Sequence, residues 1–155
     1  MERLLTELNK RNVHYGEYVV QVRDLFARKQ ESIKREDDKF FSKYWQVYAW
    51  SAIIGFVNEK RINGADLPNQ SSFQYQMISN GSDDIASGLL LMAIGKIDSN
   101  NVEDKLNSRK LLTIISEYAE GGAKYVLEIR ETPGHERKFN SPDDYFYEVV
   151  SRTRS

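Results

Sequence analysis

The stretch that decides the fold is SKYWQVYAWSAIIGFVNEKR, from Ser42 to Arg61. Its apolar residues recur at helical spacing and cover most of the circumference of the helix that they predict. A helix that is apolar nearly all round normally lies at the centre of a core. Ser42 is the expected N-cap, and the charged residues before Asn63 and Gly64 indicate an exposed C-terminal end. We therefore expect residues 42–61 to form the central helix of the domain.

Helices are also expected before and after this one. Glu17–Ile33 has the apolar spacing of an amphipathic helix, although the β-branched residues near its start also suit a strand. Asp83–Ile97 is expected to form a helix with Ser82 as its N-cap, because the two leading aspartates suit the positive end of the helix dipole. The short segment Phe73–Ile78 stays open between helix and strand.

The next expected helix is a long one. It runs from Val102 or Ser108 toward residue 129, with leucines and isoleucines on its inward side. Gly121 and Gly122 fall within it, where they either kink or end the helix, or let another backbone approach closely. The central helix is one candidate for that close approach. If the glycines end the helix instead, Tyr125–Ile129 continues as a strand.

The C-terminal segment carries the start signal of a last, short helix. Ser141 is the expected N-cap, Pro142 occupies the first helical position, and an apolar face follows that can dock onto the body. Five or so helices, without a convincing alternating pattern for a β-hairpin, predict an all-α fold. We expect a single compact helical domain over residues 1–155, of about five helices with a short C-terminal docking helix.

Composition restricts the class of protein. The 155 residues suit one domain, and 22 Lys and Arg against 23 Asp and Glu give a net charge of −1, so no bulk charge draws the chain to nucleic acid or lipid. With 0 Cys there is no disulfide and no thiolate metal site. Residues 1–12 lack the apolar run of a secretory signal, and the longest apolar stretch, Trp45–Val57, is shorter than the ~20 residues that a membrane span needs. We therefore expect a cytoplasmic protein that does not enter a membrane.

Residues that commonly carry catalysis do not form a recognisable constellation. The two histidines, His14 and His135, lie far apart, and neither belongs to a metal-binding pattern. Most of the paired carboxylates stand at expected helix starts, where the helix dipole explains them. The sequence also lacks a phosphate-binding loop and a nucleophile elbow. We expect no catalytic residues, no metal and no cofactor, and a metal-dependent nuclease with a scattered site is the least favoured alternative.

The near-neutral total charge hides a basic stretch in the N-terminal third of the chain. Residues 23–43 contain more basic than acidic side chains, whereas most of the charged side chains in residues 66–105 are acidic. Such a stretch can meet phosphates or orient a protein partner, although a solvated helix face is the commoner explanation of mixed charge. The candidate contact residues for nucleic acid or a partner are Arg28, Lys29, Lys34, Arg35, Lys60 and Arg61.

Two blocks of the chain resemble a known family. The first lies in Phe40–Ile62, where the matching residues are Val47, Ala49, Ala52, Gly55, Phe56, Lys60 and Arg61. The second lies in Ile114–Ile129, where the matching residues are Glu117, Tyr118, Ala119, Gly121 and Gly122. In these residues, their order and their separation, the chain resembles the fourth family of DNA phosphorothioation-associated (Dnd system-associated) proteins. Two features depart from the family pattern: Ser51 stands in place of its usual small residue, and residues 132–155 form an extension.

The resemblance implies a small accessory component of a bacterial DNA-modification or anti-phage defence system, and it brings no catalytic residues with it. Its motif residues are mainly expected to pack helices; they are Gly55, Phe56, Glu117, Tyr118, Gly121 and Gly122. The leading hypothesis is a non-enzymatic protein that acts by protein–protein contact in such a system. The alternative is a sequence-independent DNA-binding module. Self-association into a homo-oligomer is a further expectation, because the apolar face of the last helix can dock in trans as well as in cis.

Overall fold

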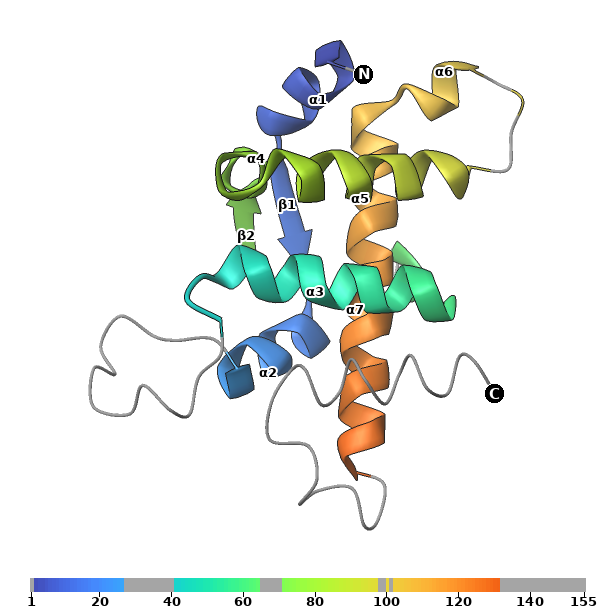
Figure 1. Ribbon diagram of the computed structural model, residues 1–155. Helices are drawn as coiled ribbons and strands as arrows, with labels where there is room; N and C mark the ends of the chain where they lie inside the picture. Colours follow the sequence, from blue (N-terminus) through green and yellow to red (C-terminus); the bar gives the residue numbers. More distant parts are fainter. Residues whose placement is uncertain (1, 27–40, 65–70, 98–99, 101, 132–155) are drawn as a thin grey trace.

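The computed structural model describes residues 2–26, 41–64, 71–97, 100 and 102–131. Over these residues the chain forms helices and one two-stranded sheet (Figure 1). The elements are α1 (Glu2–Asn9), β1 (Asn12–Tyr15), α2 (Glu17–Phe26), α3 (Tyr44–Asn58), β2 (Ser71–Gln74), α4 (Gln76–Gly81), α5 (Asp83–Gly95), α6 (Val102–Lys105) and α7 (Ser108–Glu131). The expected all-α class is confirmed, with seven helices in the described part of the chain rather than about five.

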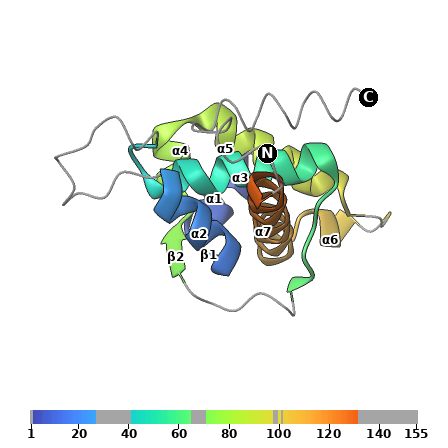
Figure 2. The same ribbon diagram turned by 90° about the horizontal axis from the view of Figure 1, so that it is seen from below.

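The longest helix, α7, is the axis around which the other elements are arranged. It runs unbroken through Gly121 and Gly122 to Glu131, so the alternative of a strand over Tyr125–Ile129 is wrong. Figure 1 shows α3 and α5 crossing in front of α7, and Figure 2 shows α7 nearly end-on, with α3 and α5 on one side and α2 on another. Its buried positions extend almost all round the helix in the middle of its length. A helix surrounded in this way has to be apolar or to have its polar groups satisfied locally.

The central helix predicted over residues 42–61 is α3, which is shorter at both ends. Its N-cap is Lys43 rather than Ser42, and the side chain of Gln46 turns back to accept a hydrogen bond from the Lys43 amide at 3.1 Å. At the other end Glu59 adopts a left-handed conformation with φ of 53°, and the Lys60 amide donates to the Gly55 carbonyl at 2.9 Å. A left-handed residue followed by this backbone bond is a standard helix stop, so the charged residues that follow lie outside the helix.

The helical domain also contains a small antiparallel sheet, formed by β1 and β2, which the sequence analysis did not predict. Val13 pairs with Phe73 and Tyr15 with Ser71. Along β1 the residues alternate between exposed and buried, as a strand with one face on a core requires. Each strand has only four residues, which is too short for alternation to stand out in the sequence. The two strands also lie far apart in the chain, so no turn signal connects them.

The predictions for α2, α4 and α5 agree more closely with the structure. Ser82 caps α5 as expected, since its hydroxyl accepts a hydrogen bond from the Ile85 amide at 3.2 Å. The segment that stayed open, Phe73–Ile78, contains both alternatives: it ends β2 and begins α4. The amphipathic helix predicted over Glu17–Ile33 is α2 up to Phe26, and its remainder lies outside the described residues, as does the short helix predicted after Ser141.

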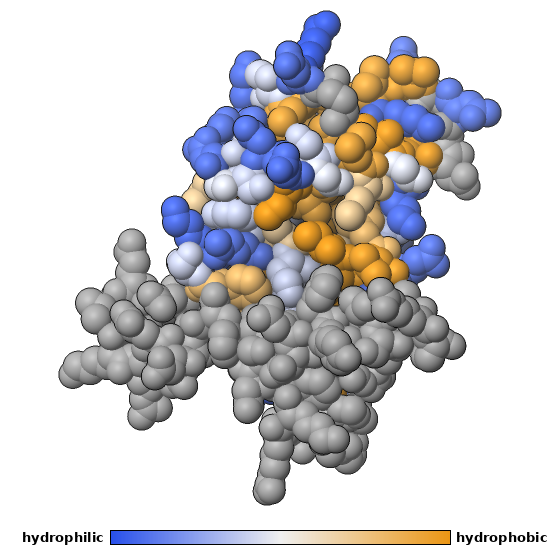
Figure 3. All heavy atoms as spheres, viewed as in Figure 1, coloured by the Kyte–Doolittle hydropathy of each residue, from blue (hydrophilic) through white to orange (hydrophobic). Residues whose placement is uncertain are grey.

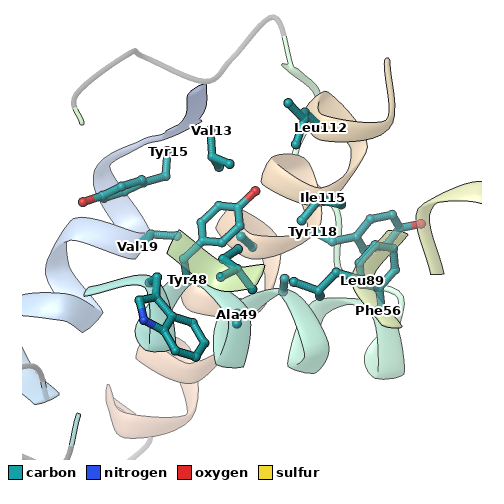
Figure 4. Close-up of a cluster of buried hydrophobic side chains, with 14 of the residues drawn as sticks. Val13, Tyr15, Val19, Tyr48, Ala49, Phe56, Leu89, Leu112, Ile115 and Tyr118 are labelled. Carbon is teal, nitrogen blue, oxygen red and sulfur yellow. The ribbon is translucent and has the colours of Figure 1, made fainter. Parts of the chain in front are cut away.

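One hydrophobic core joins these elements. Figure 4 shows side chains from several elements meeting in it, with Tyr48 of α3 between Tyr15 of β1 and the side chains of α7. Tyr48 is fully buried, and its hydroxyl lies 2.8 Å from the hydroxyl of Ser116, so the polar end of this ring is satisfied inside the core. None of the described helices combines the length and the apolar character needed to cross a membrane.

Candidate functional site

The residues of the two family-like blocks meet where α3 crosses α7. A Cβ atom added to Gly55 would lie 2.0 Å from the carbonyl oxygen of Tyr118, and one added to Gly122 would lie 1.9 Å from the carbonyl oxygen of Ser51. Gly121 lies comparably close to the backbone that follows α3. The close approach expected between the two helices is therefore present, and only glycine allows it at these positions. These glycines allow the backbones of the two helices to lie in direct contact at the crossing.

Glu117 holds the segment that follows α3 against α7. Its carboxylate accepts a hydrogen bond from Nη2 of Arg61 at 2.8 Å and one from the amide of Gly64 at 2.5 Å. Its backbone carbonyl also accepts a hydrogen bond from the amide of Ile62 at 3.1 Å. The side chain is buried, so these partners replace the water that the charge has lost. Glu117 is thus a polar clamp, in addition to the packing role expected from the sequence.

The neighbouring ring of Tyr118 extends this contact to α3 and α5. It stacks on Phe56 with a centroid distance of 4.2 Å and an angle of 21° between the planes, and the two rings are seen together in Figure 4. The Arg61 guanidinium lies 5.4 Å from the Tyr118 ring centroid, and the Lys96 ammonium lies 5.6 Å from it. Distances of this size allow cation–π attraction. The family-like residues Phe56 and Tyr118 are therefore structural neighbours.

The two candidate contact residues inside the described part of the chain, Lys60 and Arg61, already have partners in the fold. Lys60 places its ammonium 5.0 Å from the Tyr125 ring centroid. Burial alone would lower the pKa of Arg61, but its hydrogen bond and attraction to Glu117 outweigh this and raise that pKa. The structure therefore assigns both cations a role in holding α3 to α7. The other four candidates, Arg28, Lys29, Lys34 and Arg35, lie outside the described residues.

A second buried carboxylate, Glu120, was not singled out from the sequence. It reaches from α7 to the first turn of α2, where it accepts hydrogen bonds from the amides of Gly16 at 2.7 Å, Tyr18 at 3.0 Å and Val19 at 3.2 Å. A carboxylate suits the positive end of a helix dipole. Burial nevertheless raises the pKa of Glu120, against the opposing effect of the three amides. The sequence contains a pattern that indicates buried carboxylates, because Glu117 and Glu120 lie among the inward-facing apolar residues of one helix.

The outward face of α5 is apolar, and none of the described residues covers it. Leu91 and Met92 are 56% and 37% exposed, and they lie between Gly88 and Gly95 on the face opposite the buried residues of this helix. A Cβ atom added to either glycine would meet nothing within 4 Å. Figure 3 shows hydrophobic residues gathered over α5 and the adjacent α6 on the face turned to the viewer. We call Gly88, Leu91, Met92 and Gly95 the α5 face.

A basic cleft lies between β1 and the first turns of α7. It has a volume of about 670 Å³, and its lining includes Lys10, Arg11, His14 and Arg109. None of these four was a candidate from the sequence, because the fold alone brings Arg109 next to the segment that carries Lys10, Arg11 and His14. His14, an isolated histidine in the sequence, lies on the exposed side of β1 beside this cleft. We call it the basic cleft.

Comparison with known family models, with curated proteins and with solved structures finds no match. The resemblance to the phosphorothioation-associated family therefore stays a prediction. Within the described residues no group of three or more His, Asp or Glu side chains is placed to hold a metal ion. The two buried glutamates of α7 instead bind an arginine and backbone amides of the protein itself.

Proposed function

We propose that this protein is a non-enzymatic accessory protein of a bacterial DNA-modification or defence system, and that it binds a protein partner through the α5 face. The system is suggested by the two family-like blocks in Phe40–Ile62 and Ile114–Ile129. The mode of action is supported by a single structural observation, the apolar surface of α5 that no described residue covers. Apolar side chains grouped on an exposed face are typical of surfaces that bind another protein.

The glycines of the α5 face give further support for a partner that packs closely on this helix. Gly88 lies inside a helix, where glycine costs about 1 kcal/mol of stability relative to alanine. At Gly55 and Gly122 that cost is explained, because another backbone occupies the space of the missing side chain. At Gly88 nothing in the described structure occupies that space. A partner that approaches α5 closely would supply the missing reason.

The shape of the face suggests what approaches it. Gly88 and Gly95 lie two turns apart, with Leu91 and Met92 between them. A helix of the partner can rest against the two glycines while its own apolar side chains cover Leu91 and Met92. Small residues that let two helix backbones come together, flanked by larger apolar ones, give a contact of this kind. We therefore expect the partner to present an amphipathic helix.

Co-purification tests the proposal directly. The chain is co-expressed with the DNA phosphorothioation proteins of its host, and Leu91→Glu is compared with wild type. Covering a leucine contributes about 1.5–3 kcal/mol, so placing a charge there is expected to weaken the complex at least tenfold. Met77→Glu is the matched control, since Met77 is a similarly exposed apolar residue on α4. The proposal is wrong if none of these proteins co-purifies, or if Leu91→Glu binds as well as wild type.

A second variant separates a lost contact from a damaged fold. Gly88→Ala is expected to stabilise the isolated protein, because alanine favours a helix and the space around residue 88 is open. The same methyl group is expected to weaken partner binding, because it holds the partner's helix away. Greater stability combined with weaker binding cannot come from misfolding. Unchanged binding by a stabilised Gly88→Ala would argue against a helix packed on this face.

A further inference from the structure

We propose that the basic cleft between β1 and α7 binds a phosphate-bearing ligand. This inference is independent of the partner surface, because the cleft is built from the α1–β1 connection, β1 and α7, whereas the α5 face belongs to another helix. The cleft has a described lining that includes three cations, Lys10, Arg11 and Arg109, and a wall of α7 residues, Leu112, Thr113 and Ser116. Its volume of about 670 Å³ lies in the range of ordinary small-molecule sites.

The charge of the lining is one-sided. Lys10, Arg11 and Arg109 are cations at neutral pH, and no aspartate or glutamate occurs among the described lining residues. The chain as a whole has a net charge of −1, so this concentration is local and does not follow from composition. Three cations around one concave surface raise the local concentration of anions. The lining therefore selects for a ligand with more than one negative charge.

Lys10, Arg11 and Arg109, like several other cations in the described part of the chain, have no described acidic partner. Arg61 is paired with Glu117 and Lys110 with Asp104, whereas no described carboxylate lies within ion-pair distance of Lys10, Arg11 or Arg109. Bringing three like charges together without compensation costs stability unless an anion joins them. A bound phosphate would supply that compensation. Arginine is well suited to it, because its planar guanidinium donates two parallel hydrogen bonds to phosphate oxygens.

One of the arginines is already oriented. The Nε atom of Arg11 donates a hydrogen bond to the hydroxyl of Ser108 at 2.7 Å, which fixes the side chain against the start of α7 and leaves the two terminal nitrogens to a ligand. Arg109 follows in the first turn of α7, a helix of 24 residues. The positive end of the helix dipole adds to the charge of these side chains. The two arginines thus come from distant parts of the chain and face the same cleft.

The contacts within the lining indicate where the ligand lies. The hydroxyl of Thr113 donates to the Arg109 carbonyl at 3.0 Å, and the Ser116 hydroxyl is occupied by Tyr48. The inner wall therefore has its polar groups satisfied, and Leu112 adds apolar surface to it. The cations stand at the exposed rim. This arrangement fits a ligand whose phosphates lie at the rim and whose less polar part rests on the wall, such as a nucleotide or a stretch of nucleic acid.

Binding measurements by calorimetry distinguish the two sources of phosphate. The full-length protein is titrated with inorganic pyrophosphate, with ATP and with a short DNA duplex, each at low and at raised salt. Saturable binding of ATP or pyrophosphate supports a site for a free nucleotide. Binding of duplex that weakens steeply as salt rises supports a nucleic-acid backbone. If none of the three binds at low salt, the proposal is wrong.

Variants assign the binding to this cleft. Arg109→Gln is expected to weaken the observed binding at least tenfold. Arg130→Gln, a matched change near the opposite end of α7, is expected to leave it within about twofold. If Arg109→Gln fails to fold, Lys10→Gln replaces it, because Lys10 is an exposed residue outside any helix or strand. Equal losses in Arg109→Gln and Arg130→Gln, or no loss in a folded cleft variant, would overturn the assignment. Neither outcome bears on partner binding through α5.

Discussion

Gly122 of α7 and Gly88 of α5 have opposite surroundings, so the same substitution is expected to have opposite effects at the two positions. At Gly122 a methyl group would overlap the carbonyl of Ser51, so Gly122→Ala has to push α3 and α7 apart. Overpacking in a well-packed core typically costs about 1–3 kcal/mol, and backbone atoms yield less readily than side chains. We therefore expect Gly122→Ala to lower the free energy of unfolding by at least that amount, measured by urea denaturation.

Gly88→Ala is the control for this change. The substitution is the same, but the added methyl group points into open space, so only helix propensity changes. We expect the free energy of unfolding to rise by about 0.5–1 kcal/mol. A similar loss of stability in both variants would contradict the close approach seen at Gly122.

Glu120 predicts how stability depends on pH. Burial raises the pKa of Glu120 above its ordinary value of 4.5, so the folded state holds this proton more tightly than the unfolded chain. Protonation of Glu120 therefore favours folding, and that contribution is fully present below pH 4.5. It is lost as the pH rises through the folded-state pKa of the group.

The measurement compares wild type with Glu120→Gln, which cannot titrate. We expect the free energy of unfolding of wild type, relative to this variant, to fall as the pH is raised from about 4.5 toward neutrality. The difference removes the effects of other groups that titrate in the same range. A difference that stays constant would show that the three amides at the start of α2 balance the burial of the carboxylate, and one that rises with pH would show that they outweigh it.

At the scale of elements, the structure separates what sequence patterns reveal from what only contacts create. The crossing of α3 and α7 could be predicted, because Gly55 and Gly122 each lie within an apolar run whose spacing defines a helix. The pairing of β1 with β2 could not, because it joins short segments across a large separation in the chain. Local periodicity carries no information about such a pairing.

The candidate sites show the same division. Lys60 and Arg61 attracted attention as a basic pair at the end of a helix, yet their partners, Tyr125 and Glu117, belong to α7. The residues that do gather positive charge, around Arg109, come from both ends of the described chain. A charge count along the sequence reports neighbours in the chain, whereas a site is made of neighbours in space. Glu117 and Glu120, two glutamates among the apolar residues of one helix, indicated buried carboxylates, and the sequence analysis did not use this pattern.

The clamp between Glu117 and the segment after α3 makes a prediction about an element rather than a single bond. Two backbone amides of that segment are held by the same residue in different ways. Gly64 donates to the Glu117 side chain, whereas Ile62 donates to the Glu117 backbone carbonyl. Glu117→Ala removes only the first acceptor. We expect hydrogen exchange to speed up strongly at Gly64 and much less at Ile62.

Amide exchange followed by nuclear magnetic resonance gives this comparison residue by residue. Arg61→Ala serves as the control, because it removes the cation and leaves both acceptors of these amides in place. If Gly64 exchanges no faster in Glu117→Ala than in Arg61→Ala, the carboxylate does not hold this segment. Equal acceleration at Gly64 and Ile62 would indicate that the whole end of α3 has detached.

At the scale of the whole molecule, α7 makes the fold a single unit. It packs against α1, α2, α3, α5 and β1. Each of these elements is packed on α7, so the unfolding of α7 removes the packing of all of them at once. We therefore expect the described part of the chain to unfold in one cooperative step, as small single domains usually do.

Ile115→Ala tests this cooperativity from the middle of α7. Ile115 is fully buried, so Ile115→Ala is expected to lower the free energy of unfolding by about 2–5 kcal/mol. The control is Leu106→Ala, because Leu106 follows α6 and is 54% exposed. This control is expected to change the free energy of unfolding by less than about 0.5 kcal/mol. Two probes follow the denaturation: circular dichroism reports all the helices, and tryptophan fluorescence reports Trp45 and Trp50 of α3. Because α3 and α7 share one core, both probes are expected to give the same lowered midpoint in Ile115→Ala. Separate midpoints would mean that α3 keeps its packing after α7 has opened, and that the protein is built from two independently stable parts.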